Sequence, residues 1–462
     1  AADPSVEYVE VDQLMQATLV PNDTRFSEQW GFGTSNASIN VRPAWDKATG
    51  AGVVVAVIDT GITNHPDLNA NILPGYDFIS DAAMARDGGG RDNTPNDEGD
   101  WYAANECGAG IPASNSSWHG THVAGTVAAV TNNSTGVAGT AFNAKVVPVR
   151  VLGKCGGYTS DIADAIVWAS GGTVSGVPAN ANPAEVINMS LGGGGSCSTT
   201  YQTAINGAVS RGTTVVVAAG NSNTNVSSSV PANCANVIAV AATTSAGARA
   251  SFSNYGTGID ISAPGQGILS TLNTGTTVPG SASYASYNGT SMAAPHVAGV
   301  VALIQSVAPT ALSPAAIESL LKSTARPLPG ACSGGCGAGI VDADAAVTAA
   351  LNGTGPGPGT GNVLQNNVPV TGLGAASGAS LAYTVTVPSG RSQLKVSIAG
   401  GSGDADLYVR NGSAPTDTVY TCRPYLSGNN ETCTIASPAA GTWHVRVKAY
   451  STFSGVTLTA QY

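Results

Sequence analysis

Charged residues are scarce in this sequence. Asp, Glu, Lys and Arg make up 10% of its 462 residues, against about 25% in an average globular protein. A chain that stays unfolded needs high charge and low hydrophobicity, whereas 42% of these residues are hydrophobic. The composition therefore excludes a largely disordered protein and supplies enough apolar side chains for a sizeable core.

Basic residues and long apolar runs are lacking as well. The chain has 18 Lys and Arg against 28 Asp and Glu, a net charge of -10, and it contains no basic run, which argues against nucleic acid as a partner. Apolar runs such as residues 53–58 are far shorter than the roughly 20 residues that cross a bilayer, so we expect no transmembrane helix and no membrane partner. The chain opens Ala1-Ala-Asp-Pro4, so we expect any export signal to have been removed or to lie outside this sequence.

Cys-x-x-Cys pairs of the zinc-binding or redox type are absent among the eight cysteines. An even number of cysteines predicts four disulfides and therefore an oxidising, extracellular compartment. The alternative is a set of eight free thiols buried in a cytosolic enzyme.

The chain divides at residues 351–361, where Gly and Pro alternate as in a linker. We therefore predict a first domain at residues 19–350 and a second at residues 362–462. Residues 1–18 precede both domains.

Strand and helix patterns alternate in the first domain. Its β-branched runs are typical of buried parallel strands and lie at residues 53–58, 145–151, 185–189, 213–219 and 237–242. Helix patterns lie between them, with Ser160, Ser198 and Ser313 at their starts. This alternation predicts a layered α/β fold with a mainly parallel central sheet, whereas the second domain shows only strand patterns and is predicted to be a small all-β sandwich.

Four polar residues occupy positions that suit a catalytic site. Asp59 and Asn221 each follow a buried strand, at the strand ends that line the ligand crevice of open α/β sheets. His119 begins a helix pattern, and Ser291 stands at a Gly-bounded junction between a loop and a helix. Each has a structural alternative when taken alone, because Asp forms turns, a lone His is often structural and Ser often caps a helix.

Together these residues have the chemistry of nucleophilic acyl transfer. A serine is a poor nucleophile until an adjacent imidazole takes its proton, and a buried carboxylate fixes the tautomer of that imidazole. The amide of Asn221 and the backbone N–H of Ser291 would stabilise the oxyanion. The four residues therefore predict hydrolysis of peptide bonds.

The motifs around these residues resemble those of the subtilisin-like serine peptidases, over about residues 22–351. The order Asp, His, Ser and the asparagine oxyanion donor are those of subtilisin. The matching motifs are Asp59-Thr-Gly61, His119-Gly-Thr-His-Val-Ala-Gly125, Ala219-Gly-Asn221 and Gly289-Thr-Ser291-Met-Ala-Ala-Pro295. The resemblance implies a three-layer subtilisin-like fold and a secreted, monomeric serine endopeptidase that acts on protein or peptide substrates. It also implies that His119, and not His122, is the base.

The resemblance also locates the substrate cleft. One segment would pair with the substrate backbone as an added strand, and a second would form the opposite wall of the primary pocket. These segments comprise Ser190, Leu191, Gly192 and Gly193, and Ala218, Ala219 and Gly220. Since none of them is charged, we predict broad specificity with an apolar or neutral residue before the scissile bond.

Structural calcium is a further implication of the resemblance. The ligands of a first calcium would be Asp23, Asp67, Val130, Asn133, Thr135 and Val137, a set of carboxylate, amide and carbonyl oxygens that suits Ca²⁺. We expect a second calcium at the acidic stretch that holds Asp87, Asp92, Asp97 and Asp100, because its carboxylates would repel one another unless a cation neutralised them. A solvated acidic loop is the alternative.

Disulfide pairing and the two chain ends are also interpreted through family resemblance. It favours the pairs Cys107–Cys155, Cys197–Cys234, Cys332–Cys336 and Cys422–Cys433. Residues after Val370 resemble the pre-peptidase C-terminal domain of secreted bacterial peptidases, notably in Gly403-Asp-Ala-Asp406-Leu-Tyr-Val409. The start of the chain resembles the end of the family's inhibitory propeptide, so residues 1–18 are interpreted as a propeptide remnant or junction.

Two other functions compete with this interpretation. One is an inactive adhesive protein whose tail binds a polymer, and the complete set of four site residues argues against it. The other is an esterase, since the same site cleaves activated esters. An open cleft with strand-pairing edges favours peptides.

Overall fold

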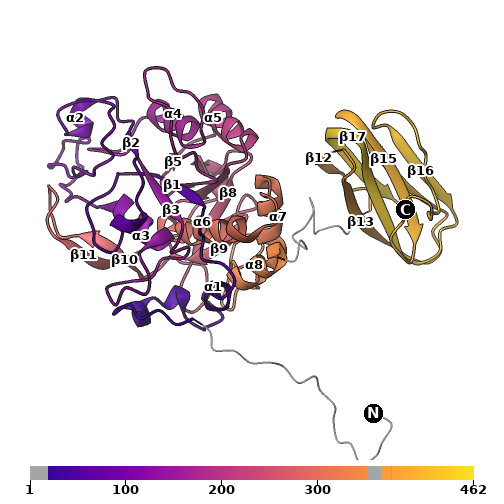
Figure 1. The fold of residues 1–462 in the computed structure, drawn as a ribbon, viewed down its shortest axis with the longest axis horizontal. Helices are drawn as coiled ribbons and strands as arrows, with labels where there is room; N and C mark the ends of the chain where they lie inside the picture. The colour runs from indigo at the N-terminus through magenta and orange to yellow at the C-terminus, as the bar shows by residue number, and fades with distance from the viewer. Residues whose placement is uncertain (1–18, 352–363, 365, 376) are drawn as a thin grey trace, which may run out of the picture.

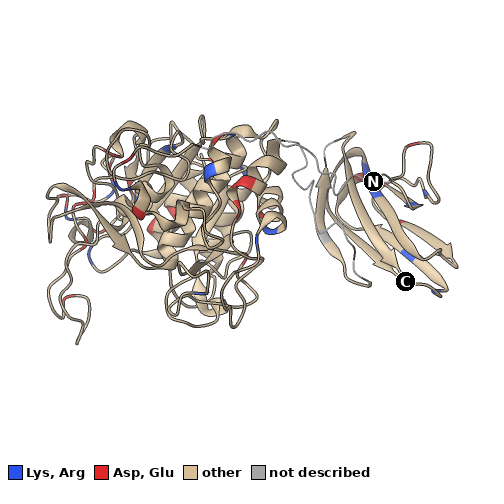
Figure 2. Cartoon of the chain, turned by 90° about the horizontal axis from the view of Figure 1, so that it is seen from below, with Lys and Arg blue, Asp and Glu red and all other residues tan. Residues whose placement is uncertain are grey.

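The computed structural model describes residues 19–351 and 364–462, except 365 and 376 (Figure 1). The predicted propeptide remnant at residues 1–18 and all but the first residue of the predicted linker lie outside the described residues. Charged residues are sparse over the part that is described (Figure 2).

A parallel sheet of seven strands forms the centre of the first part (Figure 1). The five runs predicted as parallel strands all lie in it, so this prediction is confirmed. In spatial order the strands are β2 (Tyr76–Asp77), β3 (Lys145–Arg150), β1 (Val54–Asp59), β4 (Val186–Met189), β6 (Thr214–Ala218), β8 (Ile238–Thr243) and β9 (Ile261–Pro264).

Successive residues of these strands enter two different cores, which makes three layers. In β1, Val55 and Val57 pack in one core and Ala56 and Ile58 in the other, as alternation along a strand requires. The first core contains α1 (Arg42–Trp45), α3 (His119–Ala128), α6 (Thr290–Val307), α7 (Pro314–Thr324) and α8 (Ala343–Leu351), and the second contains α4 (Thr159–Ala169) and α5 (Thr199–Ser210). The short helices α2 (Ala82–Ala85), η1 (Phe26–Glu28), η2 (Trp30–Phe32), η3 (Asn69–Asn71) and η4 (Val226–Ser228) lie in the connections.

Two of the three predicted helix starts are confirmed. Ser198 caps α5 by accepting the N–H of Tyr201, and Ser313 caps α7 by accepting that of Ala316. The assignment of Ser160 as a cap is wrong, because α4 already begins at Thr159 and Ser160 lies inside its first turn.

One helix among the described residues, α6, is long and apolar enough to cross a membrane. Most of it is buried, and it packs against α3, α8 and the strands β6 and β8. The central helix of a globular core meets the same criteria of length and hydropathy.

Two antiparallel pairs lie beside the central sheet. The hairpin of β10 (Ile268–Asn273) and β11 (Ala282–Tyr287) packs on α3 through β10. The short strands β5 (Gly193–Gly194) and β7 (Ser229–Val230) pair with each other.

The second part is an all-β structure with its own core, as the strand patterns predicted. Its longest strand, β17, pairs with β13 and β15 through its first half and with β12 and β14 through its second half, while β16 pairs with β14. The strands are β12 (Val370–Ala375), β13 (Ser380–Val387), β14 (Gln393–Ala399), β15 (Ser402–Asn411), β16 (Glu431–Ala436) and β17 (Gly441–Gln461).

Gly125 of α3 provides a test of how closely this helix approaches β10. A Cβ atom there would lie 2.1 Å from Thr271 Oγ1 and 2.4 Å from Ser270 Oγ. Both hydroxyls are held in place, because they donate to the carbonyls of Thr121 and His122.

We therefore expect Gly125→Ala to lower the free energy of unfolding by about 1–3 kcal/mol, the usual cost of overpacking a core. Gly207→Ala in α5 is the matched control, because its nearest neighbours are the terminal atoms of Arg211 at 3.4 Å. The control should gain up to about 1 kcal/mol from helix propensity. Denaturant unfolding compares the variants with the parent, and a Gly125→Ala protein as stable as the Gly207→Ala control would contradict the close packing.

Candidate active site

Asp59 and Asn221 lie at the same edge of the central sheet. Asp59 is the last residue of β1, and Asn221 follows the end of β6 by three residues. Because all strands of this sheet run parallel, their carboxyl ends meet at one edge. His119 and Ser291 reach this edge from the first turns of α3 and α6.

The structure brings Asp59 and His119 into direct contact. Nδ1 of His119 lies 2.7 Å from Oδ1 of Asp59, which also accepts the N–H of Thr60 at 2.8 Å. Asp59 is fully buried. Burial by itself would lower the pKa of His119, but the charge of Asp59 and its hydrogen bond outweigh burial and raise this pKa. Since a carboxylate only accepts hydrogen bonds, Nδ1 carries the proton and Nε2 is left as the basic nitrogen.

His122, the second histidine of the motif, has different surroundings. It is fully buried, its ring stacks on Tyr287, and its Nε2 lies 3.0 Å from the carbonyl oxygen of Ala285. Burial lowers its pKa to about 3, so it stays neutral and serves the packing between α3 and β11.

Ser291 and Asn221 line one cavity of about 900 Å³. The hydroxyl of Ser291 donates to the carbonyl of Ser190 at 3.1 Å, and the hydroxyl of Ser190 donates to the carbonyl of Ser291 at 2.7 Å. All seven predicted cleft residues, from Ser190 to Gly193 and from Ala218 to Gly220, line the same cavity, whose lining contains no charged side chain.

The amide of Asn221 is oriented by Thr290. Its oxygen accepts both the N–H and the hydroxyl of Thr290, at 2.8 Å and 2.9 Å. The NH₂ group is therefore the end of the side chain that remains to donate.

Two residues that the sequence analysis missed support this site. One is Thr290, described above. The other is Thr60, which follows β1 and whose hydroxyl donates to Asp97 at 2.6 Å and accepts the N–H of Gly120 in α3 at 2.9 Å. Each is adjacent in sequence to a predicted site residue, and this position could have indicated a supporting role. The sequence does not show, however, where a hydroxyl points.

The four acidic residues predicted to bind a second calcium do not converge. Among the described residues no group of three or more acidic, His or Cys side chains is arranged to hold a metal ion. Asp87 contacts Arg150 at 3.2 Å, and Asp92 accepts the N–H of Thr94. Asp97 accepts from Thr60, and Asp100 accepts from Ser117. In the described part of the chain the four carboxylates therefore face separate partners and not one common ion.

The residues of the first predicted calcium site do lie together. Asp23 accepts the N–H groups of Asn132 and Asn133, and Asp67 accepts the side-chain amide of Asn133 at 2.6 Å and the N–H of Val137 at 2.9 Å. Both carboxylates are buried, and burial raises the pKa of Asp67.

This donor set fits a calcium ion. No Lys or Arg of the described residues forms an ion pair with Asp23 or Asp67, and buried carboxylates need a positive partner. Within the same part of the chain, no hydrogen bond reaches the carbonyl oxygens of Val130, Thr135 and Val137. To act as a ligand, Asn133 would turn its amide so that the oxygen replaces the NH₂ group that now faces Asp67.

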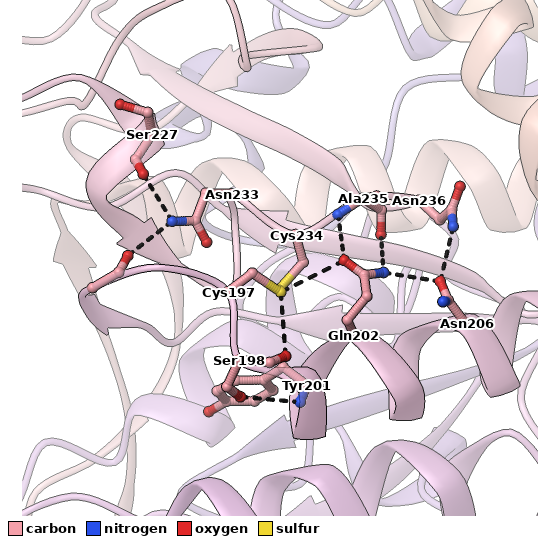
Figure 3. Close-up of a disulfide and its surroundings, with 11 residues drawn as sticks. Cys197, Ser198, Tyr201, Gln202, Asn206, Ser227, Asn233, Cys234, Ala235 and Asn236 are labelled. Carbon is pink, nitrogen blue, oxygen red and sulfur yellow. Dashed lines mark hydrogen bonds between the residues drawn. A yellow bond between two sulfur atoms is a disulfide. The ribbon is translucent and has the colours of Figure 1, made fainter.

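The four disulfides of the structure are the pairs that the resemblance implied. Cys107–Cys155 ties the loop before α3 to the segment after β3. Cys197–Cys234 lies beside α5, where Gln202 accepts the N–H of Ala235 and donates to its carbonyl (Figure 3). Asn233, next to this disulfide, donates to the carbonyls of Gly195 and Ser227 (Figure 3), so the two walls of the cleft are fastened together.

Comparison with known proteins places this site in a family. The subtilase family model matches residues 50–355, and the model of the bacterial pre-peptidase C-terminal domain matches residues 379–449. An extracellular protease of Xanthomonas campestris pv. campestris is 80% identical over all of this chain and 80% of its own length. An extracellular basic protease of Dichelobacter nodosus is 52% identical over 76% of this chain and 59% of its own length.

A solved structure of a protease from Pseudoalteromonas arctica is 62% identical and superposes with a TM-score of 0.70, covering 71% of this chain and 99% of that one. Sequence and fold therefore agree, and the relatives named extracellular indicate the compartment. The chain belongs to the subtilase family and is a secreted subtilisin-like serine protease.

Proposed function

We propose that this protease is an endopeptidase in which Ser291 is the nucleophile, His119 the general base and Asp59 the residue that orients His119. The observation that carries the proposal is the 2.7 Å contact between Asp59 Oδ1 and His119 Nδ1. It fixes the proton on Nδ1 and leaves Nε2 to take the proton of Ser291.

The reaction follows from these positions. Ser291 Oγ exchanges its bond to the carbonyl of Ser190 for one to His119 Nε2, gives up its proton and attacks the substrate carbonyl carbon. His119 then returns the proton to the leaving amine as the C–N bond breaks. In the second half, His119 takes a proton from water as the water oxygen attacks the acyl carbon. The bond between that carbon and Ser291 Oγ then breaks, and His119 returns the proton to Oγ.

The oxyanion of each tetrahedral intermediate would be held by two donors. One is the NH₂ group of Asn221, whose orientation Thr290 fixes. The other is the backbone N–H of Ser291, which lies in the first turn of α6 and has no acceptor within the helix. Donors that are fixed before the reaction stabilise developing charge most effectively.

The cavity beside Ser291 supports broad specificity with an apolar or neutral residue before the scissile bond, because its lining carries no charge. We propose that residues 190–192 pair with the substrate backbone. Gly193 already pairs with Val230 of β7, which holds the end of this segment in place.

We also propose a division into a catalytic domain (19–350), a linker (351–361) and a C-terminal domain (362–462), with residues 1–18 as the remnant of an inhibitory propeptide. The family matches at residues 50–355 and 379–449 support this division. We expect the mature protein to be a monomer.

A structural calcium held by Asp23, Asp67, Asn133 and the carbonyls of Val130, Thr135 and Val137 completes the proposal. Two buried carboxylates without an ion-pair partner among the described residues support it. The ion would neutralise them and fix the loop after α3.

Ser291→Ala tests the nucleophile. Removal of Oγ should abolish peptide hydrolysis and labelling by a fluorophosphonate. The thermal unfolding temperature should stay nearly unchanged, because the hydroxyl donates a single hydrogen bond within the described part of the chain. Fluorogenic peptide assays and mass spectrometry of the labelled protein measure both. A variant that still hydrolyses peptides at the parent rate would contradict the assignment.

The pH profile tests His119 as the base. Since His119 must be neutral and its pKa is raised above the usual value of about 6.5, kcat/KM should be fully developed at alkaline pH. It should fall as the pH drops through an inflection above about 6.5. An inflection at or below that value would show that the charge of Asp59 does not govern the base.

Chelation tests the calcium site through stability. In the Ser291→Ala background, which prevents self-digestion, EDTA should lower the unfolding temperature by several degrees, and Ca²⁺ but not Mg²⁺ should restore it. Asp67→Asn should abolish the response to EDTA. An unfolding temperature that EDTA leaves unchanged would exclude the structural calcium.

A further inference from the structure

A second cavity, of about 490 Å³, opens beside the proposed catalytic histidine. It shares Ser190, Leu152 and the Cys155–Gly156 segment with the cavity that holds Ser291. Its own walls come from the loop before α3 and from the end of β1. They include Thr60, Asp100, Tyr102, Ile111, Ser117 and His119.

Asp100 is the one acidic residue in this lining. Its two carboxylate oxygens accept the N–H of Ser117 at 2.6 Å and the hydroxyl of Ser117 at 2.8 Å. These bonds fix the direction of the carboxylate but give it no ion-pair partner, since no described Lys, Arg or His forms an ion pair with it. Its charge acts on Arg86 and His119 only without direct contact.

The basic residues nearest to Asp100 have other partners. The guanidinium group of Arg86 lies over the ring of Trp101 and donates to the backbone carbonyls of Gly99 and Trp101. Lys154 pairs with Glu106 at 2.6 Å. The negative charge in the cavity is therefore available to a ligand.

The remaining walls suit the stem of a long side chain. Leu152, Ile111 and Tyr102 are apolar or aromatic, and the disulfide Cys107–Cys155 borders the cavity and holds the loop in place. Lysine and arginine bury an alkyl stem along apolar surface while their charged end meets a polar partner. A cavity with apolar walls and one free carboxylate has this combination.

The position of the cavity identifies the substrate residue that would enter it. In an extended chain, successive side chains point to opposite sides. A residue seated in the cavity of Ser291 and Asn221 therefore directs its neighbour toward the other side of the substrate strand. Two neighbours point to that side, one before and one after the residue in the first cavity. The cavity beside His119 shares Leu152 and the Cys155–Gly156 segment with the first cavity, and we assign it to the neighbour on the amino side, the second residue before the scissile bond.

We infer that Asp100 makes this cavity a subsite selective for lysine or arginine at the second residue before the scissile bond. The inference rests on the proposed function, since it assumes a peptide that is cleaved by Ser291. The protease then prefers a neutral residue immediately before the scissile bond and a lysine or arginine one position earlier. Asp100 thus acts as a specificity-determining residue and not as a calcium ligand.

The test uses two internally quenched peptides that differ only at this position, where one carries lysine and the other norleucine. The two side chains share the same alkyl stem, so the ratio of their kcat/KM values measures the charge. Mass spectrometry of the products establishes that the same bond is cleaved. The wild-type protein should favour lysine about tenfold at low ionic strength, as expected for one partly screened charge pair, and less in 1 M salt.

Asp100→Asn should bring the ratio close to one, because asparagine lacks the charge. Its amide oxygen can still accept the N–H of Ser117, and its NH₂ group can donate to the hydroxyl oxygen of Ser117. Any change that the substitution causes at His119 affects both peptides equally and cancels in the ratio. Glu98→Gln is the matched control, since it removes a carboxylate two residues away that does not line the cavity. It should keep most of the preference.

The outcomes separate the inference from the proposed function. If the wild-type protein cleaves both peptides equally well, the subsite is refuted while peptide hydrolysis stands. Equal loss of preference in Asp100→Asn and Glu98→Gln would refute the assignment to Asp100 and indicate a general effect of net charge. If neither peptide is cleaved, the proposed function fails and the subsite with it.

Discussion

The contact between the buried carboxylate of Asp59 and His119 is the interaction on which the site depends. A buried carboxylate is costly unless donors reach it. Here the N–H of Thr60 and the ring of His119 both contact Oδ1, while Oδ2 has no partner among the described residues. The contact requires the start of α3 to approach the end of β1 closely. A Cβ atom on Gly120 would lie 2.2 Å from the carbonyl oxygen of Gly61, so the absence of a side chain at Gly120 makes this approach possible.

Close packing at positions without side chains also occurs elsewhere in the first core. The helices α3 and α6 pack on each other, and Gly125 of α3 lies against β10 while Gly299 of α6 lies against Thr140. This packing fixes where the first turns of the two helices lie. His119 and Ser291 are residues of those turns. Tight packing of the core therefore fixes the positions of these two site residues.

Although the chain has few charged residues, several carboxylates lie close to the proposed site residues. Asp97 is buried behind Thr60, and burial raises its pKa to about 7. Together with Asp100 it adds to the negative field at His119. Asp23 and Asp67 form a separate pair around the loop after α3. These four acidic residues therefore act at two separate places, beside His119 and around the loop after α3.

The sequence by itself determined the parallel sheet, because its β-branched runs and the helix patterns between them carry their periodicity locally. It also indicated Asp59, His119, Asn221 and Ser291, since each stands in a motif next to a strand end or a helix start. Only the tertiary structure decided that Asp87, Asp92, Asp97 and Asp100 separate to different partners. It also decided that Thr60 and Thr290 orient the site and that Asp100 faces a cavity. The physical reason is that composition and spacing report how many carboxylates and hydroxyls lie near one another along the chain. Which donor each of them meets is decided by contacts between residues far apart in sequence.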